Sequence, residues 1–144
     1  MSEAHFEKLE RMYHESAPIN DFFDPTLSID AGRAELRLPV KEEFYHPANA
    51  VHGTAYFKAL DDAAFFAVNS LVEDVFVLTT QMNLHLTRPI SEGTMTAVGN
   101  VVHDHPSQYI AESVLEDDDG NQLARATGTF VPSNVELTAD IGYE

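Results

Sequence analysis

Two adjacent carboxylates lie inside a segment that is otherwise almost entirely apolar. Residues 54–71 read as a helix that carries Asp61 and Asp62, and a helix that is apolar on most sides is normally buried. Asp62 follows Lys58 by one helical turn and can pair with it. Asp61 lies instead on the apolar flank with Phe65, where burial raises the pKa of a carboxyl group and makes it a stronger base or nucleophile. The alternative is that Asp61 faces solvent or caps another element.

The turn before this helix could hold a negative charge. Gly53 lets a ligand approach the backbone closely, and the first N–H groups of a helix have no partner within it. Such amides can bind an oxyanion that develops during acyl transfer. Thr54 offers a structural alternative, because its hydroxyl could cap the helix. His52 could orient the loop or contact the reacting group, and a purely structural role is the commoner one for a lone histidine at a turn.

The periodicity of apolar residues predicts the elements that position these groups. Helical spacing indicates a surface helix over residues 2–16 with Ser2 as its N-cap, and alternation indicates a hairpin over 26–40 that turns at Ala31-Gly32. After the buried helix, alternation predicts four antiparallel strands at 76–88, 94–103, 108–116 and 122–131. This order requires a sheet curved around the buried helix, which is an α+β architecture.

Finer expectations follow for the strands. In the first of the four, we expect one face to carry Phe76, Leu78, Met82, Leu84 and Leu86, and the other to carry Val77, Thr79, Gln81, Asn83, His85 and Thr87. We expect Gly120 and Asn121 to supply positive φ in the hairpin turn 118–121. The last strand is predicted to end at Pro132, and the polar tail after Ser133 to fray. The core is thus expected over about 26–132.

Composition excludes several classes of protein. The 144 residues suit one domain, and the absence of cysteine excludes disulfides, a thiol nucleophile and cysteine-based zinc sites. The net charge of −16, from 24 acidic and 8 basic residues, argues against nucleic acid or an anionic membrane as a partner. The chain carries no recognisable secretion signal or membrane span, so we expect a cytoplasmic protein. Its histidines show no metal-ligand spacing, so we expect no metal.

The ordered motifs resemble the hotdog-fold acyl-CoA thioesterases of the PaaI-like group. That group carries a His-Gly turn, an aspartate nine residues after the histidine, a strand that leads into Arg-Pro, and a later acidic-Gly hairpin. The matching segments here are Val51-His52-Gly53, Leu60-Asp61, Thr79-Thr80-Gln81-Met82-Asn83-Leu84, Arg88-Pro89, Asp118-Asp119-Gly120 and Ala124 to Phe130. Three positions depart from the group's pattern: Thr54 replaces a second glycine, His46 a frequent asparagine, and Asn49 a common glycine.

The resemblance implies a hotdog fold, with an antiparallel sheet wrapped around a long central helix, and hydrolysis of an acyl-CoA thioester. It assigns Asp61 as general base or nucleophile and the Gly53 amide as oxyanion donor, and it aligns Thr79 with a residue that positions water. The site is then expected between two subunits, in a homodimer or a dimer of dimers, so that Asp61 and Thr79 of one copy face His52-Gly53 of the other. No cofactor is expected, since coenzyme A is part of the substrate.

Weaker assignments concern the substrate. Asn49 and His46 are candidates for holding the carbonyl, Tyr56 and Phe57 for contacting an aromatic or medium-chain acyl group, and Arg88 for pairing with a phosphate of coenzyme A. For Arg88 a surface salt bridge is the simpler reading. Three other functions stay open: a hotdog enoyl-CoA hydratase or dehydratase, whose usual motifs are not evident, a non-catalytic acyl-CoA-binding protein, and a plain interaction domain, which an unreactive Asp61 and an absent pocket would favour.

Overall fold

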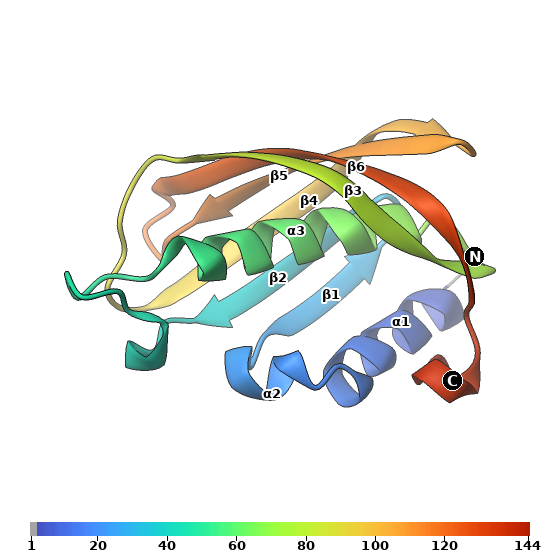
Figure 1. Cartoon of the computed structure of the whole chain (residues 1–144), viewed down its shortest axis with the longest axis horizontal. Coiled ribbons are helices and arrows are strands. Elements are labelled where there is room, and N and C mark those ends of the chain that lie inside the picture. Colours follow the sequence, from blue (N-terminus) through green and yellow to red (C-terminus); the bar gives the residue numbers. More distant parts are fainter. Residues whose placement is uncertain (1–2) are drawn as a thin grey trace.

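A six-stranded antiparallel sheet curves around one long helix in the computed structural model, which describes residues 3–144 (Figure 1). Ser2, the expected N-cap, lies outside the described residues. The order of elements agrees with the predicted helix, hairpin, long helix and four strands. In sequence order they are α1 (Glu3–Ser16), α2 (Ile19–Phe23), β1 (Thr26–Asp30), β2 (Arg33–Pro39), η1 (Glu42–Phe44), α3 (Gly53–Asn69), β3 (Val75–Leu86), β4 (Thr94–His105), β5 (Gln108–Glu116), β6 (Gln122–Glu136) and η2 (Ala139–Ile141).

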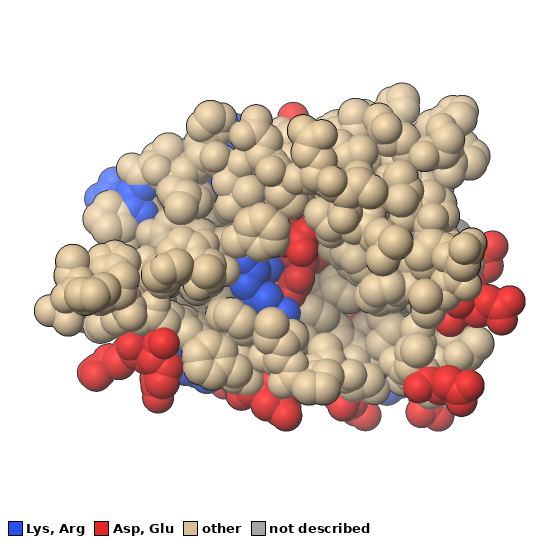
Figure 2. Space-filling view, viewed as in Figure 1, with Lys and Arg blue, Asp and Glu red and all other residues tan. Residues whose placement is uncertain are grey.

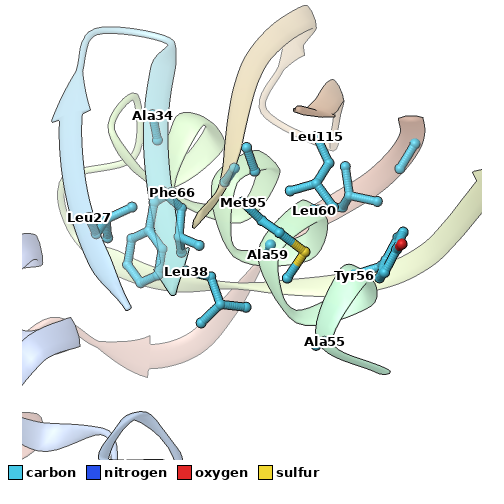
Figure 3. Packing of buried hydrophobic residues seen from close by; sticks show 14 of the residues in the cluster. Leu27, Ala34, Leu38, Ala55, Tyr56, Ala59, Leu60, Phe66, Met95 and Leu115 are labelled. Atoms are coloured by element: carbon cyan, nitrogen blue, oxygen red, sulfur yellow. The ribbon is translucent and has the colours of Figure 1, made fainter. Parts of the chain in front are cut away.

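Small residues let α3 lie directly on the sheet. One stripe of the helix consists of alanines at four-residue spacing, all of them buried: Ala55, Ala59, Ala63 and Ala67. A Cβ atom added to Gly99 of β4 would come within 2.4 Å of the Ala63 carbonyl oxygen, so the two backbones meet where neither side has a bulky group. Larger side chains from the strands, among them Leu38, Met95 and Leu115, fill the space around this stripe (Figure 3).

The strand order β1-β2-β4-β5-β6-β3 leaves β3 at one edge of the sheet. A buried asparagine fixes β3 relative to α3. The side chain of Asn69, at the end of the helix, donates to the carbonyls of Val72 and Val75 and accepts from the N–H of Val77. These three bonds end the helix two residues earlier than predicted and set where β3 begins.

The predicted faces of β3 are wrong in part, because the strand contains a β-bulge. Val77 was expected on the polar face but is fully buried, whereas Leu78 is 47% exposed. The pairing of β3 with β6 shifts between Thr79 and Gln81. An extra residue in one strand reverses the alternation beyond it. Val77 and Thr79 therefore point inward before the bulge, while Met82 packs against the core after it.

The C-terminal segment also differs from the expectation. β6 continues through Pro132 to Glu136. β5 begins at Gln108 and first pairs with β6 through Tyr109 opposite Phe130, so beyond Phe130 β6 has a partner on one side only, which is β3. Proline is tolerated at such positions. The tail is not frayed: Leu137, Ile141 and Tyr143 pack against the core, so the core extends beyond residue 132.

The tail and α1 are joined by specific contacts, and they lie side by side in Figure 1. The Tyr143 hydroxyl lies 2.7 Å from Nδ1 of His5, and Arg11 donates to the Glu144 carbonyl. In the turn at residues 118–121, Gly120 has positive φ but Asn121 does not. Asn121 instead donates to the Asp117 carboxylate through its backbone and its side chain, and this contact fixes the turn.

Candidate active site

Asp61 and Thr79 meet where α3 passes the inner face of β3. The Thr79 hydroxyl donates a hydrogen bond of 2.9 Å to Oδ1 of Asp61. Thr79 points inward because it precedes the bulge, and the side chain of Asn69 sets the start of its strand. Within residues 3–144, no other donor bonds to the Asp61 side chain. The structure thus brings together two of the predicted catalytic residues and leaves the second carboxylate oxygen available.

The surroundings of Asp61 favour its neutral form more than water does, so it binds a proton at a higher pH than an ordinary aspartate. Burial raises the pKa of Asp61 to about 6, and the hydrogen bond from Thr79 works against that rise. The negative charge of Asp62 raises the pKa further, and the charge of Lys58 lowers it. A carboxyl group with such a pKa is ionised above pH 6 and takes up a proton more readily than an ordinary aspartate. This is the behaviour that a general base requires near neutral pH.

One oxygen of the neighbouring carboxylate, Oδ2 of Asp62, contacts two donors. Nζ of Lys58 lies 2.7 Å from Oδ2 of Asp62, which confirms the predicted pair. The Tyr13 hydroxyl donates to the same oxygen over 2.6 Å. Burial, followed by the charge of Asp62, raises the pKa of Tyr13, so the phenol stays a proton donor. Sequence analysis missed Tyr13, although a tyrosine on the apolar stripe of a predicted helix requires a buried partner for its hydroxyl.

An apolar cavity of about 530 Å³ opens beside these residues. Figure 2 shows a hollow in the middle of the face that it views, with basic and acidic atoms side by side on its wall. The described charged residues that line the cavity are Lys58, Asp61 and Asp62. Most of its wall comes from α1, α3, the start of β3 and the C-terminal segment: Met12, Tyr13, Ser16, Ala17, Phe65, Phe66, Phe76, Leu78, Thr79, Val135 and Ile141.

The turn at the start of α3 lies far from Asp61 in the same chain. His52 is the N-cap, since its Nδ1 accepts a hydrogen bond from the Thr54 N–H, so the helix is not capped by Thr54. The Gly53 N–H forms no hydrogen bond to any of the described residues 3–144. Eight helical steps separate Gly53 from Asp61, which is about 12 Å along the axis. One chain alone therefore does not place both groups on one carbonyl.

The loop before the turn is tightly folded. The N–H of His46 donates to Ala50 and its carbonyl accepts from Asn49, while the N–H of His52 donates to the Phe44 carbonyl. Asn49 has a φ of 65°, in the left-handed region that favours glycine and tolerates asparagine. Asparagine in place of the glycine that is common in the PaaI-like group therefore causes little backbone strain here. The His46 ring accepts from the Ala48 N–H, so His46 helps to shape the loop.

We expect that replacing Asn49 with alanine destabilises the protein by roughly 1–2 kcal/mol. The Cβ atom of alanine is strained in the left-handed conformation, and alanine lacks the polar side chain whose local hydrogen bonds let asparagine tolerate it. Asn49→Gly is the matched control and should leave the free energy of unfolding near that of the wild type. Chemical denaturation of the three proteins measures the difference. An Asn49→Ala protein as stable as the glycine variant would contradict this account of the loop.

The predicted substrate-binding residues Tyr56, Phe57 and Arg88 lie away from the cavity of their own chain. Tyr56 is buried, and its hydroxyl donates to the Arg88 carbonyl over 2.6 Å. Phe57 is 42% exposed on the outer side of α3. Leu86, at the end of β3, is 51% exposed and approaches Gly53 closely. These residues gather around the Gly53 turn rather than around Asp61.

Residues 3–144 contain no group of three or more histidine, aspartate or glutamate side chains arranged to hold a metal ion. The His103 and His105 rings stack with centroids 6.5 Å apart on an exposed stretch of β4. Over the same described range, no helix has the length and hydropathy needed to cross a membrane.

The profile of the thioesterase superfamily matches residues 48–123, which is more than half of the chain. The chain belongs to the thioesterase superfamily. The match contains His52, Gly53, Asp61 and Thr79, and it confirms the family resemblance seen in the sequence. A protein of Saccharolobus solfataricus, named provisionally as an esterase, is 24% identical over 123 residues, which are 85% of this chain and 88% of that protein.

Solved structures confirm the hotdog fold of this thioesterase-superfamily chain. The Escherichia coli PaaI protein from the phenylacetic acid degradation operon superimposes with a TM-score of 0.85 at 19% identity, covering 95% of this chain and 99% of PaaI. A thioesterase variant from Pseudomonas aeruginosa gives a TM-score of 0.78 at 21% identity, covering 89% of this chain and 94% of that one. The architecture is thus that of the PaaI-like group.

Proposed function

We propose that this protein is an acyl-CoA thioesterase that hydrolyses an aryl- or medium-chain acyl-CoA to the free acid and coenzyme A. The observation that carries the proposal is Asp61 itself. This carboxylate is partly desolvated, accepts one hydrogen bond from Thr79, and lines an apolar cavity in a chain of the thioesterase superfamily. The cavity supplies space for an acyl group, and the carboxylate supplies a base beside it.

Asp61 can act in either of two ways. As a general base, it takes a proton from water while the water oxygen attacks the thioester carbonyl carbon; the C–S bond then breaks and the thiol leaves with a proton. As a nucleophile, its oxygen attacks the carbonyl carbon directly, the C–S bond breaks, and coenzyme A leaves as a thiolate that takes a proton from solvent. Water then hydrolyses the acyl-enzyme anhydride to the free acid and restores the Asp61 carboxylate. In both routes the carbonyl oxygen becomes an oxyanion that needs donors. Thr79 is then placed to orient either the carboxylate or the water.

We assign the oxyanion donor to the Gly53 N–H of a second copy of the chain. Within one chain the N–H is about 12 Å from Asp61 along the helix, which is too far for one carbonyl. The unpaired edge strand β3 offers a way to bring a second copy close, because an exposed edge pairs readily with another strand. Large exposed apolar side chains flank this edge: Phe57, Leu78 and Leu86.

The register of such a pairing follows from contacts within the chain. Thr79 contacts Asp61, and Leu86 approaches Gly53. If two β3 strands pair antiparallel about a two-fold axis beside Met82, the part of the strand around Thr79 in one copy lies next to the part around Leu86 in the other. That symmetric arrangement carries the Gly53 turn of each copy toward the Asp61 of its partner, and it closes two identical sites.

The cavity favours an aromatic or medium aliphatic acyl group. Its wall is rich in phenylalanine, from Phe65, Phe66 and Phe76, and aromatic rings pack well on one another. The phosphates of coenzyme A meet an unfavourable long-range field from a net charge of −16, so local groups must hold them. Arg88, at the exposed end of β3 near the Gly53 turn, is our candidate.

The test is a thiol-release assay over a panel of aryl, short, medium and long acyl-CoA substrates. We expect turnover to be highest for aryl or medium-chain thioesters and to fall when the acyl group exceeds the cavity. Incubation with an enoyl-CoA tests the rival hydratase activity, for which hydration without thiol release is the signature. Tight binding of acyl-CoA with no released thiol across the whole panel would instead identify a binding protein and overturn the proposal.

A further inference from the structure

One side of the cavity carries a polar network that the proposed hydrolysis does not use. Oδ2 of Asp62 receives two donors, Nζ of Lys58 at 2.7 Å and the Tyr13 hydroxyl at 2.6 Å. The Lys58 ammonium also lies over two aromatic rings, 5.2 Å from the centre of Tyr13 and 5.6 Å from that of Phe23. The side chains of Lys58 and Asp62 are only 11% and 15% exposed. All members except Phe23 line the cavity.

Such a network is a poor way to gain stability. Burying an ion pair removes its hydration, and the attraction between the two charges barely offsets that cost. A protein with apolar residues of similar size in their place is often as stable or more stable. The network nevertheless sits in an otherwise apolar wall, one residue along the helix from the proposed base. Its position therefore suggests a role toward Asp61 rather than toward the fold.

The role follows from the two neighbouring carboxylates. Two like charges on adjacent residues of a cavity wall oppose each other's ionisation. The groups that face Asp61 from the elements packed against it are Asp62 and Lys58 on α3, the Thr79 hydroxyl on β3, and the Tyr13 hydroxyl on α1, which acts through Asp62. The Lys58 ammonium and the Tyr13 phenol both contact Oδ2 of Asp62, and they leave Asp61 as the carboxylate of the cavity wall without a bonded cation.

We propose that Tyr13, Lys58 and Asp62 form a positioning network for Asp61: Tyr13 and Lys58 occupy Oδ2 of Asp62, so that Asp61, which receives only the Thr79 hydroxyl, is the carboxylate that acts on the substrate. The inference rests on the proposed function, and it makes α1 part of the active site. Tyr13 couples this helix to α3 through its hydrogen bond to Asp62, and its ring is held by an edge contact with Phe66 at 5.1 Å.

Three variants test the network through the pH dependence of kcat/KM. The acid limb is the part of the pH profile where kcat/KM falls as pH drops. Asp62→Asn removes the negative charge beside Asp61 and leaves Lys58, so the acid limb should move to lower pH by about one unit. Lys58→Met removes the cation and leaves Asp62, so the limb should move upward by about as much. Tyr13→Phe keeps the ring and removes one donor to Asp62, so the limb should lie between those of the wild type and Lys58→Met.

Controls separate the network from general charge effects. Asp21→Asn and Lys41→Met change the same charges outside the cavity and should leave the limb unmoved. Because phosphates of the substrate titrate near pH 6, a carbon NMR titration of the Asp61 carboxyl without substrate is the second readout, and it should show the same directions.

The outcomes distinguish this proposal from the one on which it rests. Opposite shifts in Asp62→Asn and Lys58→Met support the network. If either variant leaves both the acid limb and the NMR titration where the wild type has them, the network is structural only and the proposal is overturned. If instead Asp61→Asn retains full turnover, the proposed function fails, whatever these variants do.

Discussion

Replacing Asp61 with asparagine should lower thioester turnover by roughly 10²- to 10⁴-fold, the usual contribution of a general base. Asparagine is nearly isosteric and can still accept the hydrogen bond from Thr79, but it can neither take a proton nor attack a carbonyl. Thiol release with the best substrate of the panel measures the loss. Asp21→Asn is the matched control, because it removes an exposed carboxylate outside the cavity and should retain turnover.

The same substitution should stabilise the fold. The pKa of Asp61 is about 6 in the folded protein against a model-peptide value of 3.8, so the ionised form is disfavoured on folding. This cost is absent below pH 3.8, grows as pH rises, and is fully present above pH 6. It amounts to about 3 kcal/mol. Asp61→Asn should therefore raise the free energy of unfolding at pH 8 and change it little at pH 3.5.

Wild-type activity should fall as pH drops through about 6, since the working form of Asp61 is ionised. Denaturation curves at pH 3.5 and 8 test the expected stability of Asp61→Asn, and the pH profile of turnover tests the expected loss of wild-type activity. Full turnover in Asp61→Asn, or an asparagine variant that is less stable at pH 8, would contradict the assigned role and environment of this carboxylate.

Co-expression of two inactive variants should restore activity if the site spans two copies of the chain. One variant is Asp61→Asn, and the other is Gly53→Pro, which deletes the proposed oxyanion donor. Proline suits the first position of a helix, and the extended backbone of His52 before it is compatible. A mixed dimer holds one site with Asp61 and the Gly53 N–H both intact. With equal expression, about a quarter of wild-type activity should return.

Each variant alone should be slow, and loss of one oxyanion donor typically costs roughly 10²–10³ in kcat. Gly53→Ala keeps the N–H and is the matched control, which should stay active by itself. Different affinity tags on the two variants allow the mixed dimer to be purified before the assay. A purified mixed dimer no faster than the sum of the single variants would place the whole site within one chain.

Most of the fold could be predicted because the chain alternates strongly and its long helix is unusually apolar. The order of elements, the hairpin at 26–40 and the pair Lys58–Asp62 all followed from local spacing. The bulge in β3 could not be predicted, because no glycine or proline marks it and alternation alone gives two consistent faces. The end of β6 was missed because proline normally ends a strand. Pro132 is tolerated here because β5 begins only opposite Phe130, and sequence spacing does not show where β5 begins.

The site was predictable only in part, for a related reason. Asp61 stood out by its apolar neighbours along one helix, and its contact with Thr79 was expected from the family. Tyr13 was not predicted, because it is 49 positions away from Asp62 in sequence and only the packing of α1 brings them together. The proposed placement of Gly53 opposite a partner's Asp61 involves a second chain, which spacing within one chain does not specify.

The residues that line the cavity come from two parts of the sequence, and these parts can change independently in evolution. The residues proposed to act on the substrate all lie in the matched segment 48–123. Apart from Tyr13, the wall residues outside that segment have no proposed part in the reaction: Met12, Ser16, Ala17, Val135 and Ile141. Mutations of these five residues can resize the cavity without touching the reaction centre. Related proteins that share the central segment are thus free to diverge in the acids they release while retaining one mechanism.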